Sequence, residues 1–306
     1  MPSIAYFGPQ GTFSEQAARA FADESHTFTP VRTVPAAMAA VRAGEADLAC
    51  VPVENSVEGA VSATMDGLVV DEPLVAVAEV LLPVRFSVLV RPGTTAADVK
   101  TVASHPHALA QVQVWLAANL EHAVQHASTS TASAAVGVQD GEFDAAVTAP
   151  VAVTHYPLEV LATDVADVDD AVTRFLLLQR PGKLSAPTGA DRTSVAAVAA
   201  AERTGVLAEM LTELALRGIN LSRIESRPQK GRLGEYWFYL DIDGHITEQR
   251  VGDALAALHR RCQLVRFLGS YPRADGTPSI GPSGNTDDDY SAAADWLNDV
   301  RDGRTG

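Results

Sequence analysis

Cysteine is scarce in this chain of 306 residues, where Cys50 and Cys262 are the only two. Two thiols so far apart in sequence form neither a disulfide framework nor a cluster of metal ligands, which fits a reducing compartment. The sequence also lacks a G-x-S-x-G nucleophile elbow and a G-x-G-x-x-G dinucleotide fingerprint. We therefore expect any chemistry to run without a metal, a cofactor or an activated thiol.

Basic residues are few, with 23 Lys and Arg against 38 Asp and Glu and a formal net charge of -15. Such a charge excludes nonspecific attraction to nucleic acid or to an anionic membrane surface. No apolar run approaches the roughly 20 residues that span a bilayer, and no secretory signal is visible at the N-terminus. We expect a cytoplasmic protein, and an anionic ligand would need Arg side chains or helix N-termini to reverse the local field.

Short apolar segments alternate with Ala-rich helical segments over the first 180 residues, which is typical of an α/β fold with parallel strands. Hydrophobic residues make up 47% of the chain, enough for a sizeable core. The pattern predicts helices at residues 14–22, 34–43, 61–69, 108–119 and 132–139.

Residues 179–192 are rich in Pro, Gly and Ser, which indicates a linker. The next 80 residues or so follow the order βαββαβ, which is typical of a ferredoxin-like domain. From Arg273 onward large apolar groups are few, so we expect a mobile tail in which residues 293–300 could form one short helix.

Polar residues follow the strand-like segments at several points. "GPQGTFSEQ" (residues 8–16) contains Thr12-x-x-Glu15, a capping box that opens a helix, and exposed N–H groups there attract anions. "VPVENSVEG" (51–59) turns from an apolar strand to Asn55 and Ser56, at a position where α/β sheets bind ligands. An ordinary capped turn explains each segment about as well.

"SHPHALAQ" (residues 104–111) brings His105 and His107 close in sequence, but a strand end before a helix is a better interpretation than a metal site. "STSTASAA" (128–135) places hydroxyls where a helix begins, and Thr148 lies at another strand end. Singly, each is a cap or a turn. Together they predict a cleft lined by strand-to-helix junctions that suits a small anion.

"DDAVTRFLLLQR" (residues 169–180) ends in an apolar run that predicts a core strand. Thr173 and Arg174 stand at the start of this run. Thr is common in strands and Arg often lies at strand ends, so the segment by itself supports either a structural or a chemical role.

Taken together, these motifs resemble those of the prephenate dehydratase family, and the likeness covers residues 4 to 272. The motifs that carry it, in the family's order, are "GPQGTFSEQA", "VPVENSVEG", "SHPHALAQ", "STASAA", "VTRF" and "GINLSRIESRP". The resemblance implies an α/β fold with a two-lobed, periplasmic-binding-protein-like catalytic domain and a ferredoxin-like βαββαβ ACT regulatory domain. It also implies the monofunctional type, which has no chorismate mutase domain.

The implied catalytic domain spans residues 1–182, with one lobe of about residues 1–78 and 152–182 and another of 79–151. A linker at 183–192, an ACT domain at 193–272 and a mobile acidic tail at 273–306 would follow.

Members of this family convert prephenate to phenylpyruvate in phenylalanine biosynthesis by removing water and CO2. The resemblance assigns hydrogen-bond or proton donation to Thr173, with Arg174 polarising that group or anchoring a carboxylate. It assigns substrate binding to Asn55, Ser56 and Thr148, with Phe175 beneath the pocket. The family often has Asn two residues before the Thr, and this chain has Ala171 there.

In the ACT domain the resemblance implies a phenylalanine site between paired domains, and hence a homodimer or homotetramer under feedback regulation. The implied effector contacts are Gly205, Val206, Leu207, Ala208, Asn220, Glu225, Ser226, Arg227 and Pro228. The alternative interpretation is that Val206 and Leu207 are only core residues where a helix begins.

Two other functions remain as alternatives. An arogenate dehydratase shares these motifs and acts on a substrate with an amino group in place of a keto group. A noncatalytic amino-acid sensor could keep the two-lobed fold, but it would not need Thr173 and Arg174.

Overall fold

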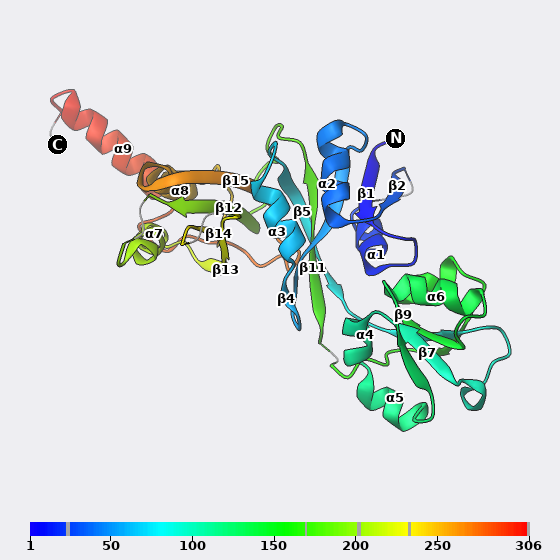
Figure 1. The fold of residues 1–306 in the computed structure, drawn as a ribbon. Helices are drawn as coiled ribbons and strands as arrows, with labels where there is room; N and C mark the ends of the chain where they lie inside the picture. Colours follow the sequence, from blue (N-terminus) through cyan, green and yellow to red (C-terminus); the bar gives the residue numbers. More distant parts are fainter. Residues whose placement is uncertain (23–24, 169, 201–202, 232–233, 305–306) are drawn as a thin grey trace. The chain divides into compact units, whose positions relative to one another are not determined.

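The computed structural model describes residues 1–22, 25–168, 170–200, 203–231 and 234–304. The chain forms two compact units, residues 1–67 with 80–180 and residues 68–79 with 181–306. Figure 1 shows the strands and helices alternating along the first unit, as the sequence predicts. Strand β5 (Val75–Pro83) leads from the residues of the second unit into those of the first.

The first lobe of the first unit is built on three parallel strands in the order β2 (Thr27–Val31), β1 (Ser3–Phe7) and β3 (Leu48–Asn55). Strand β11 (Val172–Gln179) pairs with β3 in the antiparallel direction, and the short β4 (Gly59–Ala60) pairs with the end of β3. The helices of this lobe are α1 (Phe13–Ala20), α2 (Val34–Ala43) and α3 (Ser62–Val69).

Helix α2 confirms the predicted bounds because the sequence marks both of its ends. The Thr33 hydroxyl accepts a hydrogen bond from the backbone N–H of Ala36, Pro35 occupies the first turn, and Gly44 ends the helix in the left-handed conformation. The apolar side of α2 is buried, and the helix lies along β1 (Figure 1).

The second lobe has a separate sheet in the order β10 (Glu159–Ala162), β6 (Ser87–Val90), β9 (Ala145–Thr148), β7 (Thr101–Ser104) and β8 (Val124–Ala127). Helix α6 (Thr131–Gln139) packs on β9 and β7, and the short 3₁₀ helices η1 (Ala96–Asp98) and η2 (Pro150–Thr154) join other elements.

One long helix was predicted at residues 108–119, and that prediction is wrong. The structure has α4 (Pro106–Ala110) and α5 (Gln113–Asn119) instead. The N–H groups of Gln111 and Val112 bond to carbonyls three residues back, which breaks the α-helical ladder. This tight turn carries Val112, which is fully buried in the core of the lobe.

The second unit confirms the βαββαβ order. Its elements are β12 (Asp191–Ala199), α7 (Val206–Ala215), β13 (Leu221–Pro228), β14 (Tyr236–Asp243), α8 (Gln249–Arg261) and β15 (Cys262–Pro272). The strands follow the order β13-β14-β12-β15, so the first and third strands of the motif are neighbours, as in ferredoxin-like domains. Met210, Leu214 and Leu258 from the helices pack on Leu240 of the sheet.

The C-terminal segment forms helix α9 (Asp287–Arg301), which is longer than the short helix expected there. A capping box of Thr286 and Asp289 opens this helix. The segment before α9 and the first residue of α9 are both hydrogen-bonded to α8. Arg250 donates to the carbonyl and hydroxyl of Ser279, and Asp287 Oδ1 accepts from the backbone N–H of Gln249 at 2.8 Å.

A substitution at Gly218 tests the contact between the segment before α9 and the rest of the second unit. Its φ is +61°, and a Cβ added there would overlap the ring of Pro282. We expect Gly218→Ala to lower the free energy of unfolding by about 3 kcal/mol, from backbone strain and overpacking together. Urea unfolding would measure this.

Gly189→Ala is the matched control, because Gly189 has φ of +83° but no atom lies within 4 Å of an added Cβ. We expect a loss of about 1 kcal/mol there, from the left-handed conformation alone. Equal losses in the two variants would show that the contact with Pro282 contributes nothing.

Candidate active site

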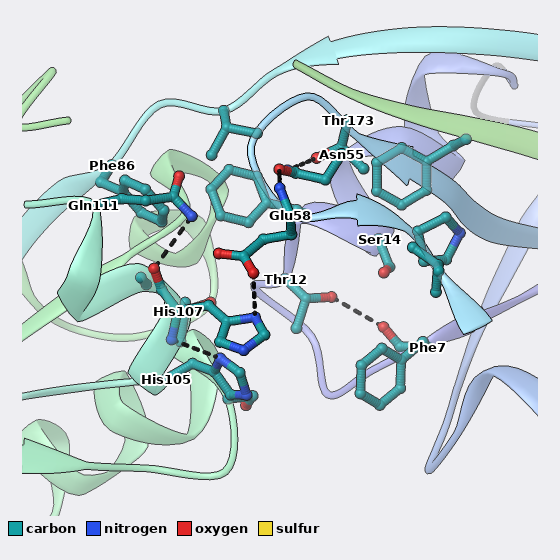
Figure 2. A pocket seen from close by; sticks show the side chains of 18 of the residues that line it. Phe7, Thr12, Ser14, Asn55, Glu58, Phe86, His105, His107, Gln111 and Thr173 are labelled. Atoms are coloured by element: carbon teal, nitrogen blue, oxygen red, sulfur yellow. Dashed lines mark hydrogen bonds and ion pairs between the residues drawn. The ribbon is translucent and has the colours of Figure 1, made fainter. Parts of the chain in front are cut away.

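A pocket of about 480 Å³ in the first unit is lined by residues of both lobes (Figure 2). That volume is typical of a site for a small organic ligand. The first lobe contributes the loop after β1, the end of β3 and the start of β11, and the second lobe contributes the segments after β7 and β8. Its polar lining residues are Thr12, Ser14, Asn55, Glu58, His105, His107, Gln111, Thr129, Ser130, Thr131 and Thr173.

Thr173 is held by Asn55 across the β3–β11 ladder, in which the two residues are direct partners. The Asn55 Nδ2 group donates to Thr173 Oγ1 at 2.8 Å, and Asn55 Oδ1 accepts from the backbone N–H groups of Val57 at 2.8 Å and Glu58 at 3.0 Å. Those two backbone donors identify the amide oxygen, so the NH2 group must face Thr173. The Thr173 hydroxyl therefore accepts from Asn55 and keeps its own hydrogen for a group in the pocket.

This arrangement leaves the Thr173 hydroxyl able to donate a hydrogen bond, and its described partner is not one that would activate it as a nucleophile. An activated nucleophile needs a base that takes its proton. Among the described residues, Thr173 Oγ1 is bonded to an amide and to no imidazole or carboxylate. A hydroxyl that accepts a hydrogen bond is polarised and donates more strongly in turn.

Two helix N-termini face the pocket, one from each lobe. Thr12 caps α1 by accepting from the N–H of Glu15, and Ser130 caps α6 by accepting from the N–H of Ser133 at 2.9 Å. The first N–H groups of a helix have no partner within the helix, and the helix dipole adds positive potential there. No lysine or arginine is among the described lining residues, and these helix ends offer partial positive charge to an anion.

Two histidines of the second lobe face Glu58 of the first (Figure 2). His107 Nδ1 lies 3.7 Å from Glu58 Oε2, and His105 Nδ1 accepts from the His107 backbone N–H at 3.3 Å. Burial lowers the pKa of His105, and the neighbouring His107 lowers it further. His105 is therefore neutral at pH 7, as its role as an acceptor requires.

Phenylalanine rings form much of the apolar wall. Phe13 of the first lobe meets Phe86 of the second edge to face, with ring centroids 5.5 Å apart. Phe7 and the buried Phe175 line the same pocket. An unsaturated ring can lie against these faces.

Of the expected substrate and catalytic residues, the structure brings Asn55, Thr173 and Phe175 together in the pocket. Arg174 is buried on β11, and Thr148 is fully buried on β9, but neither is among the described residues that line the pocket. Ser56 joins β3 to β11 instead: its hydroxyl accepts from the Val172 N–H at 2.9 Å. Ala171 is buried, and its carbonyl accepts from the Val84 N–H.

Several pocket residues were not singled out from the sequence as ligand contacts. His105, His107 and Gln111 read as parts of a capped helix, and Thr129, Ser130 and Thr131 as another helix start. Their shared signal is their position at strand-to-helix junctions, which predicts a lined cleft but does not say which side chains reach it.

The expected effector residues lie in the second unit on two elements. Gly205 caps α7 with φ of +85°, and Val206, Leu207 and Ala208 form its first turn. Asn220 precedes β13 and donates to Asp243 Oδ2 at 2.8 Å. Glu225, Ser226, Arg227 and Pro228 end β13, paired with β14. Val206 also lines a cavity of about 210 Å³ with Arg203, Glu209 and Arg261.

Comparisons with known proteins agree with both units. The prephenate dehydratase family model matches residues 4–183, and the ACT domain model matches residues 195–260. A prephenate dehydratase of Amycolatopsis methanolica is 62% identical over 304 residues, which are 99% of this chain and 99% of that one.

Solved structures show the same likeness. The prephenate dehydratase of Arthrobacter aurescens, in complex with L-Phe, is 43% identical with a TM-score of 0.93, over 98% of this chain and 99% of that chain. GqqA, described as a novel type of quorum quenching acylase, is 31% identical with a TM-score of 0.81, over 88% of this chain and 97% of that chain.

Fold and site together define a two-lobed, periplasmic-binding-protein-like α/β enzyme that carries a ferredoxin-like ACT domain. The match to the family model and the 62% identity to a full-length relative make the assignment more specific. The chain belongs to the prephenate dehydratase family, lyases that dehydrate prephenate. None of the described helices combines the length and apolar composition that crossing a bilayer requires.

Asn55→Asp tests the orientation of the Thr173 hydroxyl. The aspartate keeps one oxygen for the N–H groups of Val57 and Glu58, but its second oxygen replaces the NH2 group that donates to Thr173. That oxygen would accept the Thr173 hydrogen, which would then no longer be available in the pocket. We expect kcat for prephenate to fall about 100-fold, the usual cost of losing one positioned donor. Steady-state assays would measure kcat, and circular dichroism would show that the fold is retained. A kcat within about two-fold of the parent would contradict the assigned orientation.

Proposed function

We propose that the pocket of the first unit binds prephenate and that Thr173 is the donor to its leaving hydroxyl. The observation that carries this proposal is the bond from Asn55 to Thr173, which leaves the Thr173 hydrogen available to a ligand in the pocket. A free Thr hydroxyl is a weak acid, so its contribution is a strong hydrogen bond in the transition state, with the proton supplied through it or by water.

The reaction consumes one proton, supplied through Thr173 or by water, and no other reactant. The bond between the ring and its carboxylate breaks and releases CO2, and that electron pair enters the ring. The ring carbon–oxygen bond breaks on the opposite side, and the departing hydroxide takes up one proton and becomes water. Because the product ring is aromatic, the driving force lies in the substrate, and the enzyme needs mainly to orient the dianion and assist the leaving group.

The lining of the pocket suits a dianion with a ring between its charges. The two carboxylates would lie at the N-termini of α1 and α6, and the ring against Phe13, Phe86 and Phe175. Partial charges of helix ends and hydroxyls attract the substrate's carboxylates. A full cation would also hold the remaining carboxylate tightly after CO2 has left, and these partial charges would not.

Arogenate is the second candidate substrate, because the carboxylate of Glu58 lines the pocket and could pair with its ammonium group. His107 lies beside the Glu58 carboxylate and competes with an ammonium group for it, so the arrangement favours prephenate, which has no ammonium group. Turnover of the two substrates in parallel assays separates them. Acylase activity is less favoured, because Thr173 has an amide partner in place of a base.

We propose that L-phenylalanine binds the ACT domain and inhibits the enzyme. The Arthrobacter aurescens structure contains L-Phe, and the cavity beside Val206 is lined by Arg203 and Glu209. These two side chains form an ion pair with each other, which the two charges of a free amino acid would have to replace. The proposed contacts are Gly205–Ala208, Asn220 and Glu225–Pro228, in a homodimer or homotetramer formed through ACT domains. We place the enzyme in the cytoplasm, because its two free cysteines suit a reducing compartment.

Thr173→Ala is expected to lower kcat about 100- to 1,000-fold, because it removes the donor to the leaving group. Thr173→Ser keeps the hydroxyl and should retain most of the activity. Release of phenylpyruvate measures turnover, and isothermal titration checks that the alanine variant still binds phenylalanine. Normal turnover in the alanine variant would remove Thr173 from the mechanism.

Arg227→Ala is expected to raise the phenylalanine concentration for half inhibition about 10-fold, because it removes a charged contact with the effector. The rate without phenylalanine should stay within about two-fold of the parent, since Arg227 belongs to the other unit. An unchanged inhibition curve would refute the site.

A further inference from the structure

Glu15 of α1 is fully buried, although the sequence marks it only as part of a capping box. The Thr12 half of that box is confirmed. The Glu15 carboxylate, however, accepts from the backbone N–H of Gly11 at 2.6 Å, one residue before the expected Thr12. Arg19 Nε donates to its other oxygen at 2.9 Å, and His155 Nε2 lies 3.0 Å from that same oxygen. A carboxylate only accepts, so His155 is the donor.

These partners come from three different places. Gly11 lies in the loop before α1, and Arg19 lies one turn further along the same helix. His155 lies directly after η2 and before β10, which pairs within the sheet of the second lobe, so this segment belongs to the second lobe and not, as expected from the sequence for residues 152–182, to the first. The Glu15 carboxylate therefore holds its own loop and the second lobe together.

Contacts next to His155 support the same connection. The Tyr156 hydroxyl donates to the carbonyl of Gln10 at 2.8 Å. Gly11 has φ of +83°, and a Cβ there would lie 2.9 Å from the Tyr156 ring and 3.3 Å from the Cβ of Ala152. The loop before α1 thus rests directly on the segment of the second lobe that contains η2.

The other side of this loop is a wall of the pocket. Thr12, Phe13 and Ser14 line the pocket, and Glu15 follows them directly in the chain. A buried carboxylate persists only where donors offset the loss of its hydration. The donors of Glu15 therefore fix the pocket wall, including the N-terminus of α1, relative to the second lobe.

We propose that Glu15 and His155 are positioning residues for the reaction: the bond between them sets the distance between the two helix N-termini that receive the substrate's carboxylates. Neither residue is among those that line the pocket, so each acts through the loop at residues 8–14. The proposal rests on the proposed function, because prephenate turnover is its readout.

The central test compares His155→Ala with Arg19→Gln. Both variants remove donors from the same oxygen of Glu15, one nitrogen of His155 and two of Arg19, but only His155 belongs to the second lobe. We expect His155→Ala to raise KM for prephenate about 10-fold and to leave kcat within about three-fold, because Thr173 and Asn55 are untouched. Arg19→Gln should change KM less than about two-fold, because the Arg19 side chain is 47% exposed and its contacts with Glu15 of α1 and the Phe28 ring of β2 lie within the first lobe.

His155→Gln provides the conservative rescue, since its amide N–H can donate to Glu15, and it should restore KM to within about three-fold of the parent. A merely destabilised protein would lose active enzyme and lower kcat, with KM unchanged. Equal KM values for His155→Ala and Arg19→Gln would overturn the proposal.

If His155→Ala does not fold, as judged by circular dichroism and thermal unfolding, Tyr156→Phe replaces it. That variant removes only the bond to the Gln10 carbonyl and should raise KM about three-fold. An unchanged KM would then overturn the proposal. Absence of prephenate turnover in the parent protein would instead refute the proposed function, so the two failures are distinguishable.

Discussion

The hydrogen bond from the Asn55 amide to Thr173 is the interaction on which the rest of the site depends. Its direction is fixed by backbone, because the N–H groups of Val57 and Glu58 occupy the amide oxygen. Strand pairing of β3 with β11 then brings the amide to the hydroxyl. A side chain with little acidity of its own is thereby oriented and polarised, which suffices for a reaction whose driving force is the formation of an aromatic ring.

A chain with a formal net charge of -15 repels a dianion at long range. Within the pocket this repulsion must be offset by nearby groups, and no Lys or Arg is among the described lining residues. The two helix N-termini offer partial positive charge on opposite sides. Each has a hydroxyl cap, Thr12 or Ser130, that accepts from the N–H group three residues later and leaves the N–H groups before it available to a ligand. Under the proposed function the relative position of the two lobes is a determinant of binding, and the role proposed for Glu15 is to fix that position.

Much of this could be predicted from the sequence because the relevant signals are local. The bounds of α2 follow from Thr33, Pro35 and Gly44, and the βαββαβ order follows from hydrophobic period and turns. The break between α4 and α5 could not be predicted, because it is imposed by the burial of Val112 in a core made of distant segments. Likewise, Thr148 and Thr173 both stand at strand ends, yet only Thr173 lines the pocket.

The sequence by itself determined the family and the fold class and pointed to Thr173 as a pocket residue, because motif order and periodicity are properties of the chain. Only the tertiary structure decided which way the Thr173 hydroxyl points, which junction residues reach the pocket and why Glu15 is buried. The physical reason is separation: the hydrogen bond of Thr173 joins residues 118 positions apart, and that of Glu15 with His155 joins residues 140 apart. No local preference encodes the geometry of such contacts, which exists only once the strands and lobes have packed.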